Sequence, residues 1–270
     1  MATITDRDSI TEDERKKIEA LNKKQAAEFR RLLGDPPDPG NVPQSFWDDV
    51  QRQTEQELAG LLLLLFLTSF NGHSAWPDYA PPDAEDRENP PGEYEKKLES
   101  TRDKISKQWT SARAKEVSKG IVQRSKDMTD TVKDDWRKRI KAGKEIPEEE
   151  VDALTDRIFG PNRIDAIVQT EGNTAVVEGG QAGTAAASKQ VGYKLEAYWA
   201  HSGRRPRGHC NAAINPCPIC SPMEGLPESQ WGNKRPGYCH PNCDCYIVYR
   251  TLSGAVIGSG QPGFTPGTPP

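Results

Sequence analysis

The sequence has few large apolar side chains. Leu, Ile, Val and Phe together supply 47 of its 270 residues, and aromatic residues make up only 7%. A share below about 20% for these four residue types is typical of chains that bury little surface. The net charge is only −4, so self-repulsion does not explain an open chain. We therefore expect a mainly α-helical, elongated body with Pro-rich linkers and small local cores, instead of one compact globule.

Long hydrophobic runs are also missing. The longest, Leu61 to Leu67, falls far short of the roughly 20 residues that span a bilayer, so we expect no membrane span. The first ten residues lack the apolar segment of a secretory signal. The run can form a buried helix segment or face another subunit. Because a pair of helices offers little area to cover it, we expect a partner to bury the following stripe. Its members are Leu58, Leu61, Leu62 and Leu65.

The motifs of common enzyme classes are absent as well. The sequence contains no P-loop, no GxSxG elbow and no HExxH helix. Pro216 to Cys220 matches half of the zinc deaminase signature, but no upstream His lies two residues before a Glu. We therefore expect that the protein is not an enzyme.

Charge is unevenly distributed along the chain. Residues 1–100 carry a net charge of −9, whereas residues 101–270 carry +5. This polarity suits a protein whose two parts meet different partners, although two solvated faces would give the same counts.

Capping and breaking residues predict the helices. A capping box at Thr11–Glu14 predicts a helix to about Leu33, and Ser45 predicts the start of a second one that reaches about Phe70. Helix is expected again from about Glu95. Its apolar stripe consists of Ile105, Trp109, Ala112, Met128, Val132, Trp136 and Ile140. Pro147 opens a further helix that Gly160 and Pro161 end, and another follows from Asn162.

The C-terminal part has a different residue composition. Residues 193–200 and 245–251 are rich in aromatic and β-branched residues and predict two strands. We expect four segments: N-terminal helices with a Pro-rich arm (1–93), a helical body (94–192), a zinc-stabilised β-hairpin module (193–253) and a flexible Gly/Pro tail (254–270).

All six cysteines lie in this module. Cys217 and Cys220 are separated by two residues, and His240, Cys243 and Cys245 follow after a gap. Two close-spaced pairs of this kind can complete a tetrahedron around Zn²⁺. We predict one structural zinc per chain, held by four of these five residues. The first choice is Cys217, Cys220, His240 and Cys243, with Cys245 able to replace His240; Cys210 and Cys239 are expected not to bind. Disulfides and buried thiols are the alternatives.

Two segments together resemble a known family. Arg163 to Glu171 is similar to the Arg-Ala-x-x-Ile-Ala-Arg-Thr-Glu helix of the phage minor head proteins, the family of phage Mu F. Tyr198–Trp199, Cys217–Cys220, Met223–Gly225 and His240–Cys245 resemble that family's closing pattern in the same order. The likeness covers about residues 100–250.

The resemblance implies a virion protein present in few copies near the portal vertex, acting in head morphogenesis, DNA packaging or DNA delivery. Its expected partners are the portal protein, other copies of itself, the major capsid protein and packaged DNA, first in the host cytoplasm and then in the capsid. Thr170 and Glu171 carry over as a structural pair, and Glu171 either bonds to the zinc module or lies exposed. The turn His201–Arg207 can contact phosphate or an acidic portal surface, or be solvated. The alternative function is a free-standing zinc protein that binds nucleic acid, although a pI of about 5.7 argues against it.

Overall fold

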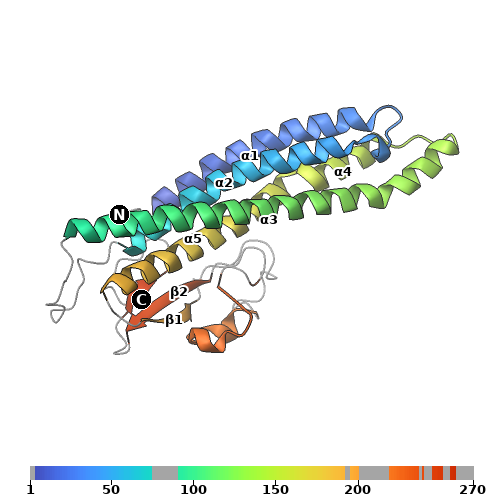
Figure 1. Ribbon diagram of the computed structural model, residues 1–270. Coiled ribbons are helices and arrows are strands. Elements are labelled where there is room, and N and C mark those ends of the chain that lie inside the picture. The colour runs from blue at the N-terminus through green and yellow to red at the C-terminus, as the bar shows by residue number, and fades with distance from the viewer. Residues whose placement is uncertain are drawn as a thin grey trace. The chain divides into compact units, whose positions relative to one another are not determined.

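A computed structural model describes residues 4–74, 91–191, 195–200, 219–236, 239, 245–251 and 256–259. These residues are mainly helical, with a small antiparallel sheet, which confirms the predicted fold class at this level. The helices are α1 (Ile4–Leu33), α2 (Gln44–Ser74), α3 (Pro91–Lys141), α4 (Glu148–Phe159) and α5 (Pro161–Val191). The strands are β1 (Leu195–Ala200), β2 (Tyr246–Thr251) and β3 (Val256–Ser259) (Figure 1). None of the described helices combines the length and apolarity of a membrane span.

The chain divides into two compact units. Unit 1 comprises Met1–Thr11, Leu62–Thr110 and Gln169–Pro270, and unit 2 comprises Glu12–Leu61 and Ser111–Val168. Long helices therefore contribute one segment to each unit.

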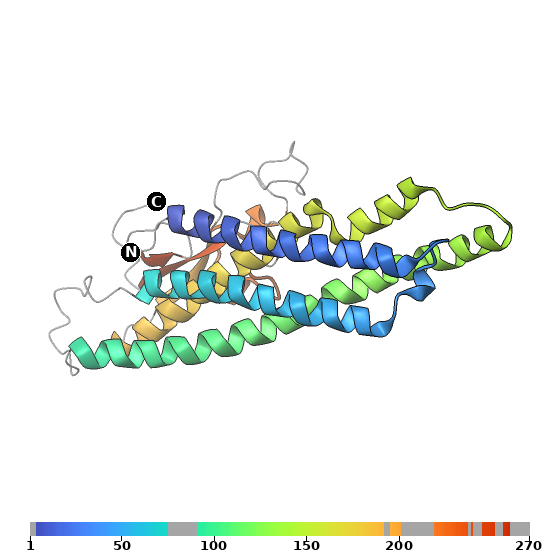
Figure 2. The same ribbon diagram turned by 90° about the horizontal axis from the view of Figure 1, so that it is seen from above.

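Unit 2 is built around aromatic side chains. Phe29 of α1 lies 5.9 Å from Trp47 of α2 and 5.7 Å from Phe159 of α4, measured between ring centroids. Around this centre, α1 runs beside α2 in both views (Figures 1 and 2). Trp136 belongs to the same buried cluster, and three partly buried residues pack against it: Met128, Val132 and Ile140. The second half of the predicted stripe on α3 is thus confirmed.

The predicted helix ends around α4 are also confirmed. Pro147 precedes the first turn, where three glutamates face the positive end of the helix dipole. At the other end, the Gly160 N–H donates to the Asp156 carbonyl at 2.8 Å. Pro161 then begins α5, because a proline lacks only an N–H that the first turn would leave unpaired.

Other helix limits differ from the prediction. α1 begins at Ile4, so Thr11 lies inside it and does not cap it. α2 continues to Ser74 and α3 already starts at Pro91, so the predicted Pro-rich linker is shorter at both ends. An N-cap contributes only about 1 kcal/mol, and longer-range packing outweighs it.

The first half of the predicted stripe on α3 is confirmed only in part, because Trp109 packs against Phe66 with ring centroids 5.3 Å apart. Ala112 is exposed, and Ile105 and Trp109 are only partly buried. The buried positions of this half of α3 instead carry small side chains, namely Ser106, Thr110, Ala114 and Ser118. Their hydroxyls turn back to the helix's own carbonyls, as when Thr110 Oγ1 donates to the Ser106 carbonyl at 2.8 Å. Because such hydroxyls are satisfied locally, small polar residues can occupy a buried helix face that a hydrophobic pattern does not reveal.

The leucine stripe on α2 is buried by the chain itself. Leu58, Leu61, Leu62 and Leu65 are each no more than 1% exposed. The expectation that they need a partner subunit is therefore wrong. Leu64, on the opposite side of the run, is 43% exposed.

In unit 1, α2 and α5 approach very closely. A Cβ added to Gly179 would lie 2.3 Å from the Phe66 carbonyl oxygen, and one added to Gly183 would lie 2.5 Å from that of Phe70. Ser69 Oγ also donates to the Val176 carbonyl at 2.6 Å. The glycines of α5 are thus required by a helix crossing in which the two backbones touch.

The sheet has the strand order β1-β2-β3, and both pairs are antiparallel. Both predicted strands are confirmed, and in their register Trp199 lies opposite Ile247. The third strand falls in the tail that we expected to be flexible, so that expectation is wrong for 256–259. The edge of β2 offers unpaired backbone groups, and Val256 and Ile257 suit a strand that pairs with them.

Candidate metal centre

Two of the five predicted zinc ligands lie in the described part of the chain. Cys220 is 0% exposed and Cys245 is 4% exposed, and both belong to one buried cluster in unit 1. Cys217, His240 and Cys243 lie outside the described residues. Within the described ranges, no group of three or more His, Cys, Asp or Glu could hold a metal. The structure brings together the two ligands it describes, and the zinc site stays a prediction.

The cluster is formed by side chains from three parts of the sequence. Its members are Val177 of α5, Ala197 and Trp199 of β1, Cys220, Met223 and Trp231 of the intervening segment, and Cys245, Ile247 and Tyr249 at β2. With so few apolar residues, this core is small for a structure that must hold two cysteine-bearing segments together.

Backbone hydrogen bonds attach β1 to the segment after Cys220. The Trp199 N–H donates to the Leu226 carbonyl at 2.9 Å, and the Gly225 N–H donates to the Trp199 carbonyl at 2.8 Å. Gly225 has a φ of +75°, which a side chain disfavours. The Met223-Glu-Gly225 turn of the family-like pattern therefore places Cys220 next to the strand.

Two buried polar atoms, one in this core and one next to Cys220 in the chain, lack a partner among the described residues. Trp199 Nε1 and Ser221 Oγ have no hydrogen-bond acceptor or donor among the described residues, although both atoms are buried. An unsatisfied buried polar group costs about 1–3 kcal/mol. A metal-bound thiolate is a strong acceptor, and hydrogen bonds to metal ligands are a regular feature of metal sites. Neither group donates to the sulfur of Cys220 or Cys245, so the two unpaired groups give no direct support to a metal at these cysteines.

The third described cysteine differs from the other two. Cys239 is half-buried, and its Sγ lies 3.3 Å from the Arg235 carbonyl oxygen, a distance at which a thiol donates. The expectation that Cys239 is not a zinc ligand stays a prediction. No disulfide joins Cys220, Cys239 and Cys245. Cys210, the other predicted non-ligand, lies outside the described residues.

Tyr249 contributes a hydroxyl to the same cluster. Burial, with smaller effects from Glu228 and Glu178, strongly raises its pKa. The phenol is therefore protonated at neutral pH, and its oxygen has no hydrogen-bond partner within the described ranges. This hydroxyl is a further polar group that the small core leaves unpaired.

The motif helix lies in α5, and its first residue is a partly buried arginine of unit 2. Arg163 donates to the Ile158 carbonyl and the Ile121 carbonyl, both at 2.8 Å, and to Ser125 Oγ at 3.0 Å. Burial, together with the nearby Arg124, lowers the pKa of Arg163 to about 10. The guanidinium is still charged at neutral pH, and the negative end of the α4 dipole compensates part of that charge. Arg163 thus connects α5 to α3 and α4.

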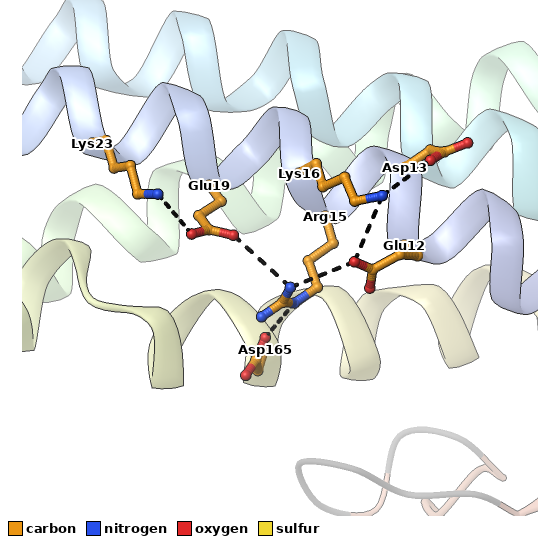
Figure 3. Close-up of polar contacts among 7 residues, drawn as sticks. All are labelled: Glu12, Asp13, Arg15, Lys16, Glu19, Lys23 and Asp165. Carbon is orange, nitrogen blue, oxygen red and sulfur yellow. Dashed lines mark hydrogen bonds and ion pairs between the residues drawn. The ribbon is translucent and has the colours of Figure 1, made fainter.

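The next charged residue of the motif contacts α1. Arg15 Nε donates to Asp165 Oδ1 at 2.7 Å, and Glu12 and Glu19 flank the same guanidinium (Figure 3). The hydrogen bond and charge of Asp165 raise the pKa of Arg15. Because both side chains are partly exposed, the pair contributes at most about 1 kcal/mol.

The end of the motif is buried in unit 1. Glu171 is only 7% exposed, so the alternative of an exposed surface glutamate is wrong. Six residues later, Val177 of the same helix enters the cluster that contains Cys220 and Cys245. The basic turn His201–Arg207 lies outside the described residues.

Sequence reasoning missed the structural roles of Arg163 and Trp199. An arginine beside the buried Ile158 and Ile164 was a usable signal for the first, because a charge so placed needs several acceptors. No pattern indicated that the Trp199 indole N–H would lack a partner, because that depends on packing.

Comparison with known proteins finds no matching family model, and neither a curated protein nor a solved structure matches the chain.

Proposed function

We propose that this chain is a structural phage minor head protein, associated with the portal vertex and acting in head morphogenesis, DNA packaging or DNA delivery. The carrying observation is that the helix with the first family-like segment also contributes a side chain to the core of the second segment. Val177, on the motif helix, packs in the same cluster as Trp199, Cys220 and Cys245 of the closing pattern. This arrangement supports a single folded module formed by the motif helix and the closing pattern. Such a module would explain why the two segments occur in this order and at this spacing along the sequence.

The residues of the motif helix support a structural role over a catalytic one. The Arg163 guanidinium donates hydrogen bonds to two carbonyls and a serine hydroxyl, and the Asp165 carboxylate is paired with Arg15. These contacts use the charged groups to join helices. We propose no enzymatic activity.

In this proposal the zinc is structural. Cys220 and Cys245 would hold it together with two of Cys217, His240 and Cys243, and four protein ligands leave no position for a substrate or water. The metal's contribution would be to hold the two cysteine-bearing segments together, which the small apolar core does only weakly.

A nonsense mutation in the gene of the parent phage tests the function. Without the protein, we expect fewer DNA-filled or infectious heads, with restoration by the wild-type gene supplied in trans. Particles made at normal yield, with normal DNA content and infectivity, would reject the proposal. A free-standing nucleic-acid-binding protein would instead leave particle structure intact and change the expression of other genes.

A further inference from the structure

We propose that four lysines of α3 form a binding surface for the phosphate backbone of double-stranded DNA. Together they make up the lysine row, whose members are Lys104, Lys107, Lys115 and Lys119. The inference goes beyond the proposed function, because a head protein can act at the portal through protein contacts alone. It uses no residue of the candidate metal centre.

The first observation is the distribution of charge along α3. Residues 104–126 contain seven Lys or Arg residues and one carboxylate, Glu116, so this stretch has a net charge of +6. Glu116 pairs with Arg113 at 3.0 Å. The helix dipole does not compensate such a charge, because its effect is confined to the first and last turns. The acidic pI of the whole chain does not cancel it either, because charges more than about 8 Å apart are largely screened at physiological ionic strength.

The second observation is that the lysine row lies on one face of the helix. Its members follow one another at steps of three, eight and four residues, which keep side chains on the same side of an α-helix. All four residues are exposed. Because α3 is one uninterrupted helix (Figure 1), this common face follows from helical geometry alone. The row extends for about 22 Å along the helix axis, a length over which one DNA strand presents about six phosphates.

The third observation is that the row has no internal partner. None of its four ammonium groups forms an ion pair or a hydrogen bond with the part of the chain that the structure describes. On α1, by contrast, Lys16 and Lys23 each pair with a carboxylate of the same helix (Figure 3). Lys115 and Lys119 lie four residues apart, where like charges destabilise a helix by about 0.2–0.5 kcal/mol. An external anion removes this repulsion, whereas no contact within the described chain does.

Double-stranded DNA fits this surface better than an acidic protein or a single strand does. The exposed residues that separate the lysines are Gln108, Ser111 and Ala112. Protein–protein interfaces are depleted in lysine and depend on aromatic and apolar anchors. Single strands stack their bases on aromatic side chains, which these three residues do not provide. Lysines neutralise phosphates without contacting bases, so the surface should bind DNA of any sequence.

The test compares two triple variants of the full chain. In the row variant, three members of the lysine row are changed: Lys107→Gln, Lys115→Gln and Lys119→Gln. In the control, three exposed lysines of α1 are changed: Lys16→Gln, Lys23→Gln and Lys24→Gln. Both variants lose the same charge. Binding to a fluorescein-labelled duplex is followed by fluorescence anisotropy from about 50 to 200 mM KCl, the range in which phosphate contacts respond strongly to salt.

The measured quantity is the slope of the logarithm of the binding constant against the logarithm of the salt concentration. We expect this slope to be about 2.7 less steep in the row variant than in the wild type, because each lost phosphate contact removes about 0.9. The control should keep the wild-type slope. A row variant with the wild-type slope, or a control that loses as much, overturns the proposal.

Wild-type protein provides a second measurement that needs no variant to fold. Exposed lysines are acetylated with and without the duplex, and the extent of acetylation at each lysine is determined by mass spectrometry. We expect the duplex to slow acetylation of Lys107, Lys115 and Lys119 but not of Lys16 and Lys23. Equal protection on both helices, or none on α3, overturns the proposed surface.

The outcomes also separate this surface from the proposed function. A wild-type chain that does not bind the duplex, although infectious particles still depend on its gene, overturns the DNA surface alone. Tighter binding to polyglutamate than to the duplex, with the same dependence on the lysine row, would identify an acidic protein as the occupant and overturn the choice of DNA.

Discussion

At the residue scale, Arg163 shows how a charged side chain can hold helices together through backbone carbonyls. Its guanidinium donates to two backbone carbonyls and one hydroxyl, which belong to α3 and α4. These carbonyls and the hydroxyl are partly buried, so removal of the donor leaves acceptors that water reaches poorly.

Arg163→Met should therefore destabilise the protein by about 2–4 kcal/mol, because charged hydrogen bonds are lost and buried acceptors remain. Urea unfolding followed by circular dichroism measures this. Arg157→Met is the control, since it removes an exposed arginine of α4. Equal stability of the two variants would contradict the structural role of Arg163.

Asp38 gives a second prediction, this time for pH. Burial alone would raise its pKa, but the Gly40 N–H and the Arg137 guanidinium lower it below the ordinary value of 3.8. A carboxyl whose pKa is lower in the folded state stabilises the protein above its unfolded pKa, and that contribution disappears as the pH falls through the folded value.

Asp38→Asn should therefore cost about 0.5–1 kcal/mol at pH 7, where the ion pair with Arg137 is intact. At a pH well below 3.8 the difference between variant and wild type should vanish. Urea unfolding at both pH values is the measurement, with the exposed Asp134→Asn as control. A difference that stays constant with pH would show that the charge of Asp38 is not involved.

At the element scale, the crossing of α2 and α5 depends on glycine. An added Cβ at Gly179 would lie 2.3 Å from a backbone oxygen, and backbone cannot rotate away as a side chain can.

Gly179→Ala is expected to destabilise the protein by about 1–3 kcal/mol through overpacking. Gly120, in the middle of α3, has nothing within 4 Å of such a Cβ. Gly120→Ala should therefore stabilise by about 0.5–1 kcal/mol, because alanine loses less entropy in a helix. Thermal unfolding of both variants tests the contrast, and a stabilised Gly179→Ala would mean that the two backbones do not touch.

The Cys/His module is expected to depend on its metal. Structural zinc contributes about 10–16 kcal/mol in small modules at pH 7. Chelation or Cys220→Ser should remove the one zinc per chain and expose β1 and β2 to hydrogen exchange. Cys239→Ser, the matched change at the cysteine that donates to Arg235, should retain both metal and protection. Native mass spectrometry and hydrogen exchange check this, and a module that keeps its protection without metal would refute it.

At the scale of the whole molecule, the sequence predicted the helical class and most element ends. Helix ends at Pro147, Gly160 and Pro161 could be predicted from the sequence, because each of these residues acts on its own turn of the backbone. The buried face of α3 could not be predicted, because the hydroxyls of Ser106 and Thr110 are satisfied by hydrogen bonds within the helix. The burial of Leu62 and Leu65 depends on packing that no single helix pattern contains. Cys220 and Cys245 share one cluster, although the spacing favoured His240 over Cys245 as a ligand beside Cys220. The unpaired indole of Trp199 emerged only from the structure.

In the proposed role, we expect the uneven charge of the chain to serve two contacts. The net charge changes from −9 in residues 1–100 to +5 in residues 101–270, which suits two different contacts. Copies around a portal ring would meet in a heterologous arrangement that closes by rotation.

The measurement that tests the central proposal most directly is quantitative mass spectrometry of purified particles of the parent phage, with the portal protein as internal standard. A minor head protein at the portal vertex should be present in a small, fixed number of copies relative to the portal. Its absence from particles, or an abundance equal to that of the major capsid protein, would contradict the account.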